Sequence, residues 1–301
     1  MMSTLHVITS VFNPSNYKSR YRLYEDFKSR LSSRRVSLRT IELAFEGQDF
    51  AVTEGSNPRH IQLRTSQRMW FKENLINIAI SRLPPNWRYV VWLDADIAFV
   101  EDDWVERTLD QLQEFSLVQP FSHVIDLGPQ YEPISLQKGF ASCQQGREPL
   151  EASAGGGQPG YAWAAKREAI EGFGGLIDWS ILGANDYYMA LALVGKLDAL
   201  HTHMPESNYA RTLLEWQDKV RRLNLKIGYV DTPLLHYWHG SRKDRGYGTR
   251  WEILKEYDFD PSLDLARTPS GLLQFTNRKP LLHQAVAAYF DQRREDSLEN
   301  G

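Results

Sequence analysis

The stretch YVVWLDADIAFV, residues 89–100, sets two aspartates into an apolar run. Apolar side chains lead into the pair and follow it, and Asp94 and Asp96 stand between them. The composition predicts a buried strand over 88–100. An ionised carboxylate is costly to bury without a partner, so this strand requires something that compensates the two charges.

The residues before this run alternate between strand-like and helix-like patterns. The order is a strand over 5–13, a helix over 17–31, a strand over 36–45, a polar irregular segment over 46–64, a helix over 66–83 and the strand over 88–100. Such alternation is typical of an α/β fold with a mostly parallel central sheet and helices on its faces. Ligands of such sheets bind beyond the carboxyl ends of the strands, so we expect Asp94 and Asp96 to face a crevice.

The remaining chain continues the pattern less regularly. We expect a helix over 101–115, a strand over 116–127, a loop rich in Gly, Gln, Ser and Pro up to 160, a strand and helix over 161–176, a helix over 183–197, a strand with its loop over 223–240 and a helix over 281–296. No repeat or linker interrupts the sequence, which favours a single composite domain. We place that domain at 1–250, with a nucleotide-binding half at about 1–100 and an acceptor and metal-loop half at about 101–250. Residues 251–301 are expected to form a C-terminal extension whose terminal helix packs on the domain.

The composition limits the classes of function. The 301 residues carry a formal net charge of −3, which does not point to nucleic acid or an anionic membrane. Cys143 is the single cysteine, so an internal disulfide and a cysteine metal cluster are excluded. No lysine or arginine precedes Lys18 and no long apolar run occurs, so we expect a cytoplasmic protein without a membrane span.

Asp94-Ala95-Asp96 is a DxD pair, a motif that also arises by chance. The chain contains a second example, Asp258-Phe259-Asp260, in a polar stretch before Pro261, where we expect it to cap a turn. The first pair differs because it ends a predicted central strand, where carboxylate oxygens suit a hard divalent cation. The alternative for the first pair is an N-cap of the following helix.

Two further segments carry chemistry. LLHYWHGSRKDRGYG (234–248) contains His236 and His239, and its Arg242 and Lys243 suit a phosphate; the alternative is a solvated basic loop. A histidine beside carboxylates shifts metal preference from Mg²⁺ toward Mn²⁺. GANDYYM (183–189) places Asp186 at a helix start, where an ionised carboxylate is favoured and can act as a base; the alternative is helix capping.

Taken in order, these segments resemble a known family. ITSVFNP followed by YKSRYRLYEDF, FKENLINIAISRL before YVVWLDADIAFV, GYAWAAKREAIEGFGG before Gly183-Ala184-Asn185-Asp186, and HYWHGSR at 236–242 are similar to GT-A-fold, family-2-like glycosyltransferases. The C-terminal half resembles the inverting β-1,4-galactosyltransferases. The resemblance covers about residues 5–245.

The resemblance implies a fold, a reaction and a set of site residues. The fold is a Rossmann-like GT-A sheet, and the reaction moves a sugar from a nucleotide-sugar donor, with a UDP-sugar favoured, to a hydroxyl acceptor with inversion. Asp96 and His239 would bind Mn²⁺ (or Mg²⁺), and Asp94 would touch the metal or the ribose. Asp186 would be the general base. The residues expected to bind the nucleotide are Phe12, Asn13, Lys72, Asn77, Asp94, Arg242 and Lys243, and those expected to bind the acceptor are Gly160, Trp163 and Asn185. Asn185 departs from the family, in which an acidic residue precedes the base, so the acceptor is open.

Other functions stay open on the sequence alone. A nucleotidyltransferase would use similar carboxylates to make a sugar nucleotide, and a non-catalytic protein of the same fold would bind a sugar nucleotide or a glycan without turnover. For a transferase the acceptor could be a glycan, a protein or a modified nucleobase. A nucleic-acid acceptor is not favoured, because no base-reading motif is visible.

Overall fold

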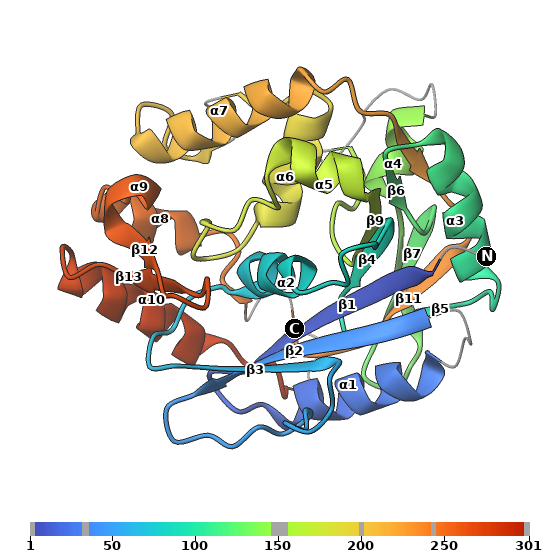
Figure 1. The fold of residues 1–301 in the computed structure, drawn as a ribbon. Coiled ribbons are helices and arrows are strands. Elements are labelled where there is room, and N and C mark those ends of the chain that lie inside the picture. Colours follow the sequence, from blue (N-terminus) through green and yellow to red (C-terminus); the bar gives the residue numbers. More distant parts are fainter. Residues whose placement is uncertain (1–3, 32–35, 146–155, 199–201, 242–244, 298–301) are drawn as a thin grey trace.

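The computed structural model describes residues 4–31, 36–145, 156–198, 202–241 and 245–297. In these residues a seven-stranded sheet has the order β10-β6-β9-β4-β1-β2-β3 (Figure 1). Its strands are β1 (Leu5–Phe12), β2 (Val36–Phe45), β3 (His60–Thr65), β4 (Tyr89–Leu93), β6 (Leu117–Gln119), β9 (Ala162–Lys166) and β10 (Ile227–Tyr229). β1 pairs in parallel with β2 and β4, whereas β9 runs antiparallel to β4 and β6. The predicted α/β class with a mostly parallel central sheet is confirmed.

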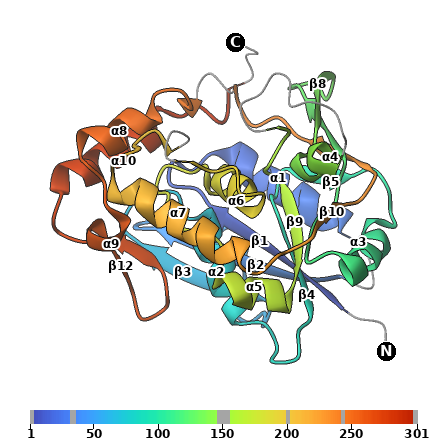
Figure 2. The same cartoon turned by 90° about the horizontal axis from the view of Figure 1, so that it is seen from above.

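Helices cover both faces of this sheet. They are α1 (Lys18–Arg30), α2 (Lys72–Ser81), α3 (Trp104–Glu114), α5 (Arg167–Phe173), α6 (Asn185–Leu193) and α7 (Asn208–Arg221). Successive strand residues point to opposite faces, so Val90 and Trp92 pack with α2, α6 and α7, while Val91 packs with α1 and α3. Figure 2 shows α5, α6 and α7 over the strands from above. Burial on both faces explains why β4 is apolar throughout.

The predicted strand over 88–100 is wrong in one respect, because it forms two strands. β4 ends at Leu93, and β5 (Ile97–Phe99) joins a smaller sheet of order β5-β11-β7-β8. Asp94 and Asp96 lie in the turn between the strands. Ile97 is buried like the residues of β4. The apolar sequence therefore continues across the turn, and the change of sheet cannot be predicted from it.

The same change of sheet divides two other predicted strands. Residues 116–127 form β6 and β7 (His123–Leu127), and residues 223–240 contain β10 and β11 (Pro233–His236). The expected irregular segment ends in β3, and the expected loop up to 160 contains β8 (Pro133–Lys138) and α4 (Phe140–Gln145). These elements are short or polar, with weak periodicity. α7 is amphipathic and was also not predicted.

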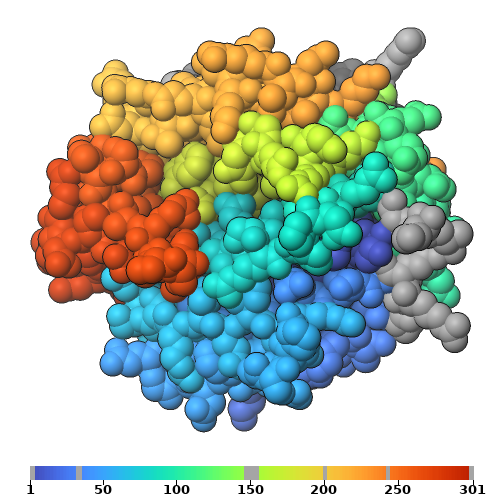
Figure 3. Space-filling model, in the orientation of Figure 1, coloured from blue at the N-terminus to red at the C-terminus, as the bar shows by residue number. Residues whose placement is uncertain are grey.

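Residues after 250 share the main core. They form α8 (Arg250–Glu256), α9 (Pro261–Asp264), β12 (Leu265–Arg267), β13 (Leu273–Phe275) and α10 (Pro280–Gln292). Phe259 and Val286 are buried in the same cluster as Ile8 of β1. In the space-filling view this part fills the left side of the face, beside the β2–β3 region (Figure 3). Asp260 accepts a hydrogen bond from the Ser262 amide at 2.9 Å and is the N-cap of α9, so the capping role expected of the second DxD is confirmed for Asp260, at a short helix instead of a turn.

No helix of the described residues combines the length and the apolar composition that crossing a bilayer requires.

Candidate active site

The turn Asp94–Asp96 directs its two carboxylates to different neighbours. The Asp94 amide donates to the Tyr161 carbonyl at 2.8 Å, which ties the end of β4 to the segment before β9. On the other side, the Tyr237 amide donates to the Asp96 carbonyl at 2.8 Å, and His236 of β11 pairs with Ile97 of β5. The turn therefore joins two groups of polar side chains at the carboxyl end of β4.

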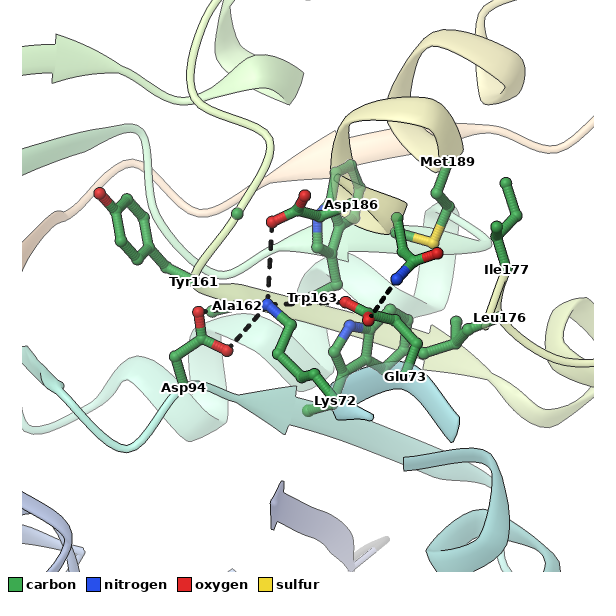
Figure 4. Close-up of a pocket in the computed structure, with 13 residues that line it drawn as sticks. Lys72, Glu73, Asp94, Tyr161, Ala162, Trp163, Leu176, Ile177, Asp186 and Met189 are labelled. Atoms are coloured by element: carbon green, nitrogen blue, oxygen red, sulfur yellow. Dashed lines mark hydrogen bonds and ion pairs between the residues drawn. The ribbon is translucent and has the colours of Figure 1, made fainter. Parts of the chain in front are cut away.

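The first group, here called the lysine cluster, consists of Lys72, Glu73, Asp94 and Asp186. Lys72 opens α2, and its Nζ lies 3.1 Å from Asp94 Oδ1 and 3.7 Å from both Asp186 Oδ2 and Glu73 Oε1 (Figure 4). Burial alone would lower the pKa of Lys72, but Asp94, Asp186 and Glu73 outweigh it and raise that pKa well above its ordinary value. The ammonium group is a fixed positive charge among these carboxylates.

Asp186 lies in the first turn of α6 and does not cap it. The N-cap residue is Ala184, and no side chain makes a cap hydrogen bond. Asp186 Oδ1 accepts a hydrogen bond from the Tyr187 amide at 2.9 Å, and the side chain is 30% exposed. A Cβ at position 160 would lie 2.9 Å from Asp186 Oδ2, so glycine leaves room for this carboxylate. Asp186 is thus held in place while it stays accessible.

Glu73 is a residue of this cluster that we did not predict. It is 5% exposed and accepts hydrogen bonds from Trp70 Nε1 and from Asn185 Nδ2, both at 2.8 Å. Burial raises the pKa of Glu73 to about 7, although Lys72 opposes this shift. Asn185 is itself 1% exposed and also accepts from the Ser180 amide at 3.1 Å. In sequence, only its position beside Lys72 at a helix start could have singled out Glu73.

The lysine cluster borders a pocket (Figure 4). Its wall includes the three residues that we predicted for the acceptor, Gly160, Trp163 and Asn185, together with Trp92, Tyr161 and Met189. Trp163 is held by a hydrogen bond from its Nε1 to the Pro159 carbonyl at 2.8 Å. Trp163 and Trp92 are buried behind this wall. The carboxylates are more exposed, with Asp94 at 24% and Asp186 at 30%, and they suit the hydroxyl groups of a sugar.

The second group, here called the histidine group, consists of Asp96, His236 and His239. The Nε2 of His239 lies 3.1 Å from Asp96 Oδ2 and 3.2 Å from His236 Nε2, and one ligand atom from each residue falls within 4.8 Å of the others. His236 Nδ1 lies 2.8 Å from Asp126 Oδ1 of β7. That contact orients the other ring nitrogen, Nε2, toward Asp96.

The charges of the histidine group favour a divalent cation. Burial, assisted by Arg245, lowers the pKa of His239 to about 4, so the imidazole is neutral and can act as a ligand. Burial would raise the pKa of Asp96, but His239, His236 and basic neighbours outweigh it and lower that pKa. Asp96 Oδ1 is buried and has no hydrogen-bond partner among the described residues. A carboxylate oxygen left without a partner beside two imidazoles fits a metal ion.

Of the remaining predicted residues, some lie beside the two groups and others make contacts elsewhere in the fold. Asp94 faces Lys72 and lies outside the histidine group. Phe12 is buried and packs edge-to-face on Trp70, and the Asn13 side chain bonds the Tyr17 backbone at 2.8 and 2.9 Å. Asn77 does not line the pocket. Its side-chain amide forms hydrogen bonds with Leu176 and Asp178 instead. The predicted phosphate contacts Arg242 and Lys243 lie outside the described residues.

Comparisons with known proteins find similarity in structure only. No protein-family model matches the sequence, and no curated protein matches it. A mutant Drosophila β-1,4-galactosyltransferase 7 in complex with manganese, UDP-Gal and xylobiose is 10% identical, with a TM-score of 0.45 over 94% of this chain and 98% of that one. For the catalytic domain of this enzyme with xylobiose the match spans 76% of this chain and 65% of that chain, at 10% identity and a TM-score of 0.38.

Two bacterial proteins are similar at the same level. A protein described as a nucleotide-diphospho-sugar transferase from Desulfovibrio desulfuricans is 14% identical, with a TM-score of 0.37 over 85% of this chain and 96% of that one. S. aureus TarS in complex with UDP-GlcNAc is 9% identical, with a TM-score of 0.44 over 79% of this chain and 59% of that one. These structural neighbours are glycosyltransferases of the kind that the sequence resembles. At such low identity the function has to be argued from the site itself.

Proposed function

We propose that this chain is a metal-dependent, inverting glycosyltransferase that moves a sugar from a nucleotide-sugar donor, with a UDP-sugar favoured, to a hydroxyl acceptor. One observation carries the proposal. The Asp94–Asp96 turn joins an accessible carboxylate pocket to a group of metal-ligand type at the carboxyl end of a parallel strand. A transferase of this class needs both parts side by side, a base for the acceptor and a positive charge for the leaving diphosphate.

Asp186 is the base in this proposal. It accepts the proton of an acceptor hydroxyl whose oxygen forms a bond to the anomeric carbon, while the bond from that carbon to the diphosphate breaks. The 30% exposure of the carboxylate leaves it open to an acceptor, and Gly160 and Trp163 line the space beside it. A single displacement of this kind inverts the configuration.

The histidine group would hold the metal ion. Asp96, His236 and His239 supply one carboxylate and two imidazole ligands, a set that favours Mn²⁺ over Mg²⁺. When bound, the ion supplies positive charge to the diphosphate that departs. Asp94 and Lys72 lie at the junction of the two groups, where we assign them to the ribose and phosphates of the donor. Asp94 could also reach the metal through water.

The other residues predicted to bind the nucleotide receive different assignments. Phe12 ends β1 and packs on Trp70, which bonds Glu73 of the lysine cluster, so Phe12 and the following Asn13 remain candidates for the nucleotide, as do Arg242 and Lys243 for its phosphates. For Asn77 the contacts support a structural role, since its amide secures the segment at 176–178 that borders the pocket. The acceptor is proposed only as a class, a glycan or another hydroxyl compound.

The first test is a thermal-shift panel of nucleotide sugars with and without Mn²⁺, followed by product analysis. A donor that binds the folded state raises the melting temperature, and Mn²⁺ should strengthen that effect. Transfer to an acceptor, or slow hydrolysis of the donor, should then stop in EDTA and return with Mn²⁺. Asp258→Asn, in the exposed turn of the second DxD, is the matched control and should behave as wild type.

The alternative functions give different products in the same assays. Donor binding without turnover would indicate a binding protein, and release of a sugar nucleotide from a nucleoside triphosphate and a sugar phosphate would indicate a nucleotidyltransferase. Full transfer activity in chelator would exclude the metal from the mechanism.

A further inference from the structure

The segment Arg293–Ser297, here called the strap, follows α10 and lies against the start of α1. The Asp296 carboxylate accepts hydrogen bonds from the Lys18 and Ser19 amides at 3.0 and 2.9 Å. The Ser19 hydroxyl donates to the Glu295 carbonyl at 3.1 Å. A carboxylate on the free amides of a helix N-terminus is a favourable pairing, so the strap is anchored there.

The strap also contacts the loop that carries His239. Trp238 Nε1 donates to the Ser297 carbonyl at 2.8 Å. Gly240 has φ +92°, and a Cβ there would collide with the carbonyl of Arg294. The two segments therefore pack backbone against backbone, with His239 between the residues that touch the strap.

Glu295 is the strap residue whose side chain points inward. Its side chain is 3% exposed, and its carboxylate pairs with Arg20 and lies 2.8 Å from Arg293 Nη2. Burial would raise the pKa of Glu295, but Arg20 and Arg293 outweigh it and hold that pKa well below its ordinary value. Oε2 of this buried anion lies 3.8 Å from Nδ1 of His239.

The two imidazoles of the histidine group have carboxylates in the same order around them, with the carboxylate beside His236 closer than the one beside His239. Each has its Nε2 near Asp96, and each has a carboxylate on the side of Nδ1: Asp126 at 2.8 Å for His236, and Glu295 at 3.8 Å for His239. His239 Nδ1 is buried without a hydrogen-bond partner among the described residues. Metal-binding histidines usually donate their second N–H to such a carboxylate, which fixes the ring and strengthens the ligand.

We propose that Glu295 is a positioning residue of the metal centre, and that the strap brings its carboxylate to His239 as β7 brings Asp126 to His236. The inference rests on the proposed metal site. It assigns the segment after α10 a role in metal binding that neither the DxD pair nor the histidine loop reveals. Because Glu295 is paired with Arg20, the same carboxylate connects α1 to the metal centre.

The test is a titration of the metal-free protein with Mn²⁺ alone. The electron paramagnetic resonance signal of free Mn²⁺ measures how much of the ion is bound. Loss of such an outer carboxylate typically costs about 10–100-fold in metal affinity, which we expect for Glu295→Gln. Asp126→Asn should give a loss of the same order. Glu295→Asp keeps the charge and should recover part of the affinity. The melting temperature without metal shows whether each variant is folded.

Asp296→Asn is the matched control, because it loosens the anchor on α1 and leaves the carboxylate beside His239 in place. Its Mn²⁺ affinity should stay close to that of wild type. An equal loss in Asp296→Asn would mean that the strap acts only as a general support, and would overturn the assignment of Glu295.

Glu295→Gln leaves Arg20 and Arg293 without their buried partner and could fail to fold. In that case Glu295→Gln combined with Arg20→Gln removes one of the remaining charges and repeats the titration against Arg20→Gln alone. A folded variant lacking the carboxylate with unchanged Mn²⁺ affinity overturns the inference. Absence of Mn²⁺ binding in wild type overturns the proposed metal-dependent function as well, so the two failures are distinguishable.

Discussion

The lysine cluster and the histidine group are joined by one turn, yet their charges are balanced in different ways. In the lysine cluster a protein cation, Lys72, already lies among the carboxylates. In the histidine group a carboxylate faces imidazoles, one of which has a pKa of about 4, and an oxygen of Asp96 has no hydrogen-bond partner among the described residues. The first group contains its own cation, whereas the second fits an added one.

This difference assigns separate tasks to the two residues of the DxD pair. Asp94 contributes to the group that holds its own counter-charge, and Asp96 contributes to the group suited to a metal. Single substitutions can therefore disturb one group while the other stays intact, and the expected effects differ in kind.

The largest effect is expected for Asp186→Asn in the lysine cluster. Removal of a general base typically costs about 10²–10⁴-fold, so transfer should fall on that scale. Donor and Mn²⁺ binding should persist, because the histidine group is unchanged. Turnover is measured under saturating donor, and near wild-type turnover would remove Asp186 from its proposed role.

The next effect separates the two aspartates directly. Asp96→Asn removes a ligand and should weaken Mn²⁺ binding by more than the roughly 100-fold upper range of an outer-shell change. Asp94→Asn should weaken Mn²⁺ binding much less, since Asp94 pairs with Lys72. Calorimetric titration of both variants with Mn²⁺ measures the contrast, and equal losses would show that the two groups act as one site.

A smaller effect is expected for Gly160→Ala. The added Cβ would lie 2.9 Å from Asp186 Oδ2 and displace that carboxylate. Since a misplacement of about 1 Å can cost up to about 10²-fold, we expect a loss of roughly tenfold in kcat. Mn²⁺ affinity is the internal control, and a change there would contradict the independence of the two groups.

The smallest effect concerns pH and Glu73. Its pKa is about 7 in the folded protein and lies near 4.5 without the fold, so between these values the unfolded chain loses its proton first. The contribution of Glu73 to the free energy of unfolding should therefore fall as pH rises from 4.5 to 7 and level off above that, whereas the lowered pKa of His239 acts in the opposite direction over part of this range. Urea unfolding at pH 5 and pH 8 measures the change in the free energy of unfolding between the two pH values, which should be more positive for Glu73→Gln than for wild type. An identical pH dependence in the two proteins would contradict the raised pKa.

The first half of the fold could be predicted because its elements are long and strongly patterned. The expected strand over 36–45 matches β2, and the helix over 17–31 contains α1. The turn inside 88–100 was missed because both flanking strands are apolar, and the change of sheet depends on β11, which lies more than 130 residues later. Three-residue strands such as β10 are too short for an alternating pattern to be recognised.

The candidate site was predictable to the extent that its residues stand in recognisable motifs. Asp96, His239 and Asp186 belong to such motifs, and the structure brings Asp96 beside His239, with Asp186 on the other side of the turn. Asp126, Glu73 and Glu295 have no local signature, since their surroundings arise only from contacts across the fold. The candidate ligands and the candidate base stand in local motifs, whereas the buried carboxylates packed around them do not.

Gly240 has a practical consequence for anyone who purifies this protein. Its contact with Arg294 brings the strap onto the histidine loop, so a polyhistidine tag at the carboxyl end would be joined to a segment that itself packs beside candidate metal ligands. Such a tag could compete for Mn²⁺ and alter every affinity measured. Leu5 begins β1, and the strand carries the chain roughly 25 Å before it reaches Phe12 near the site. A cleavable tag at the amino end is therefore the better choice.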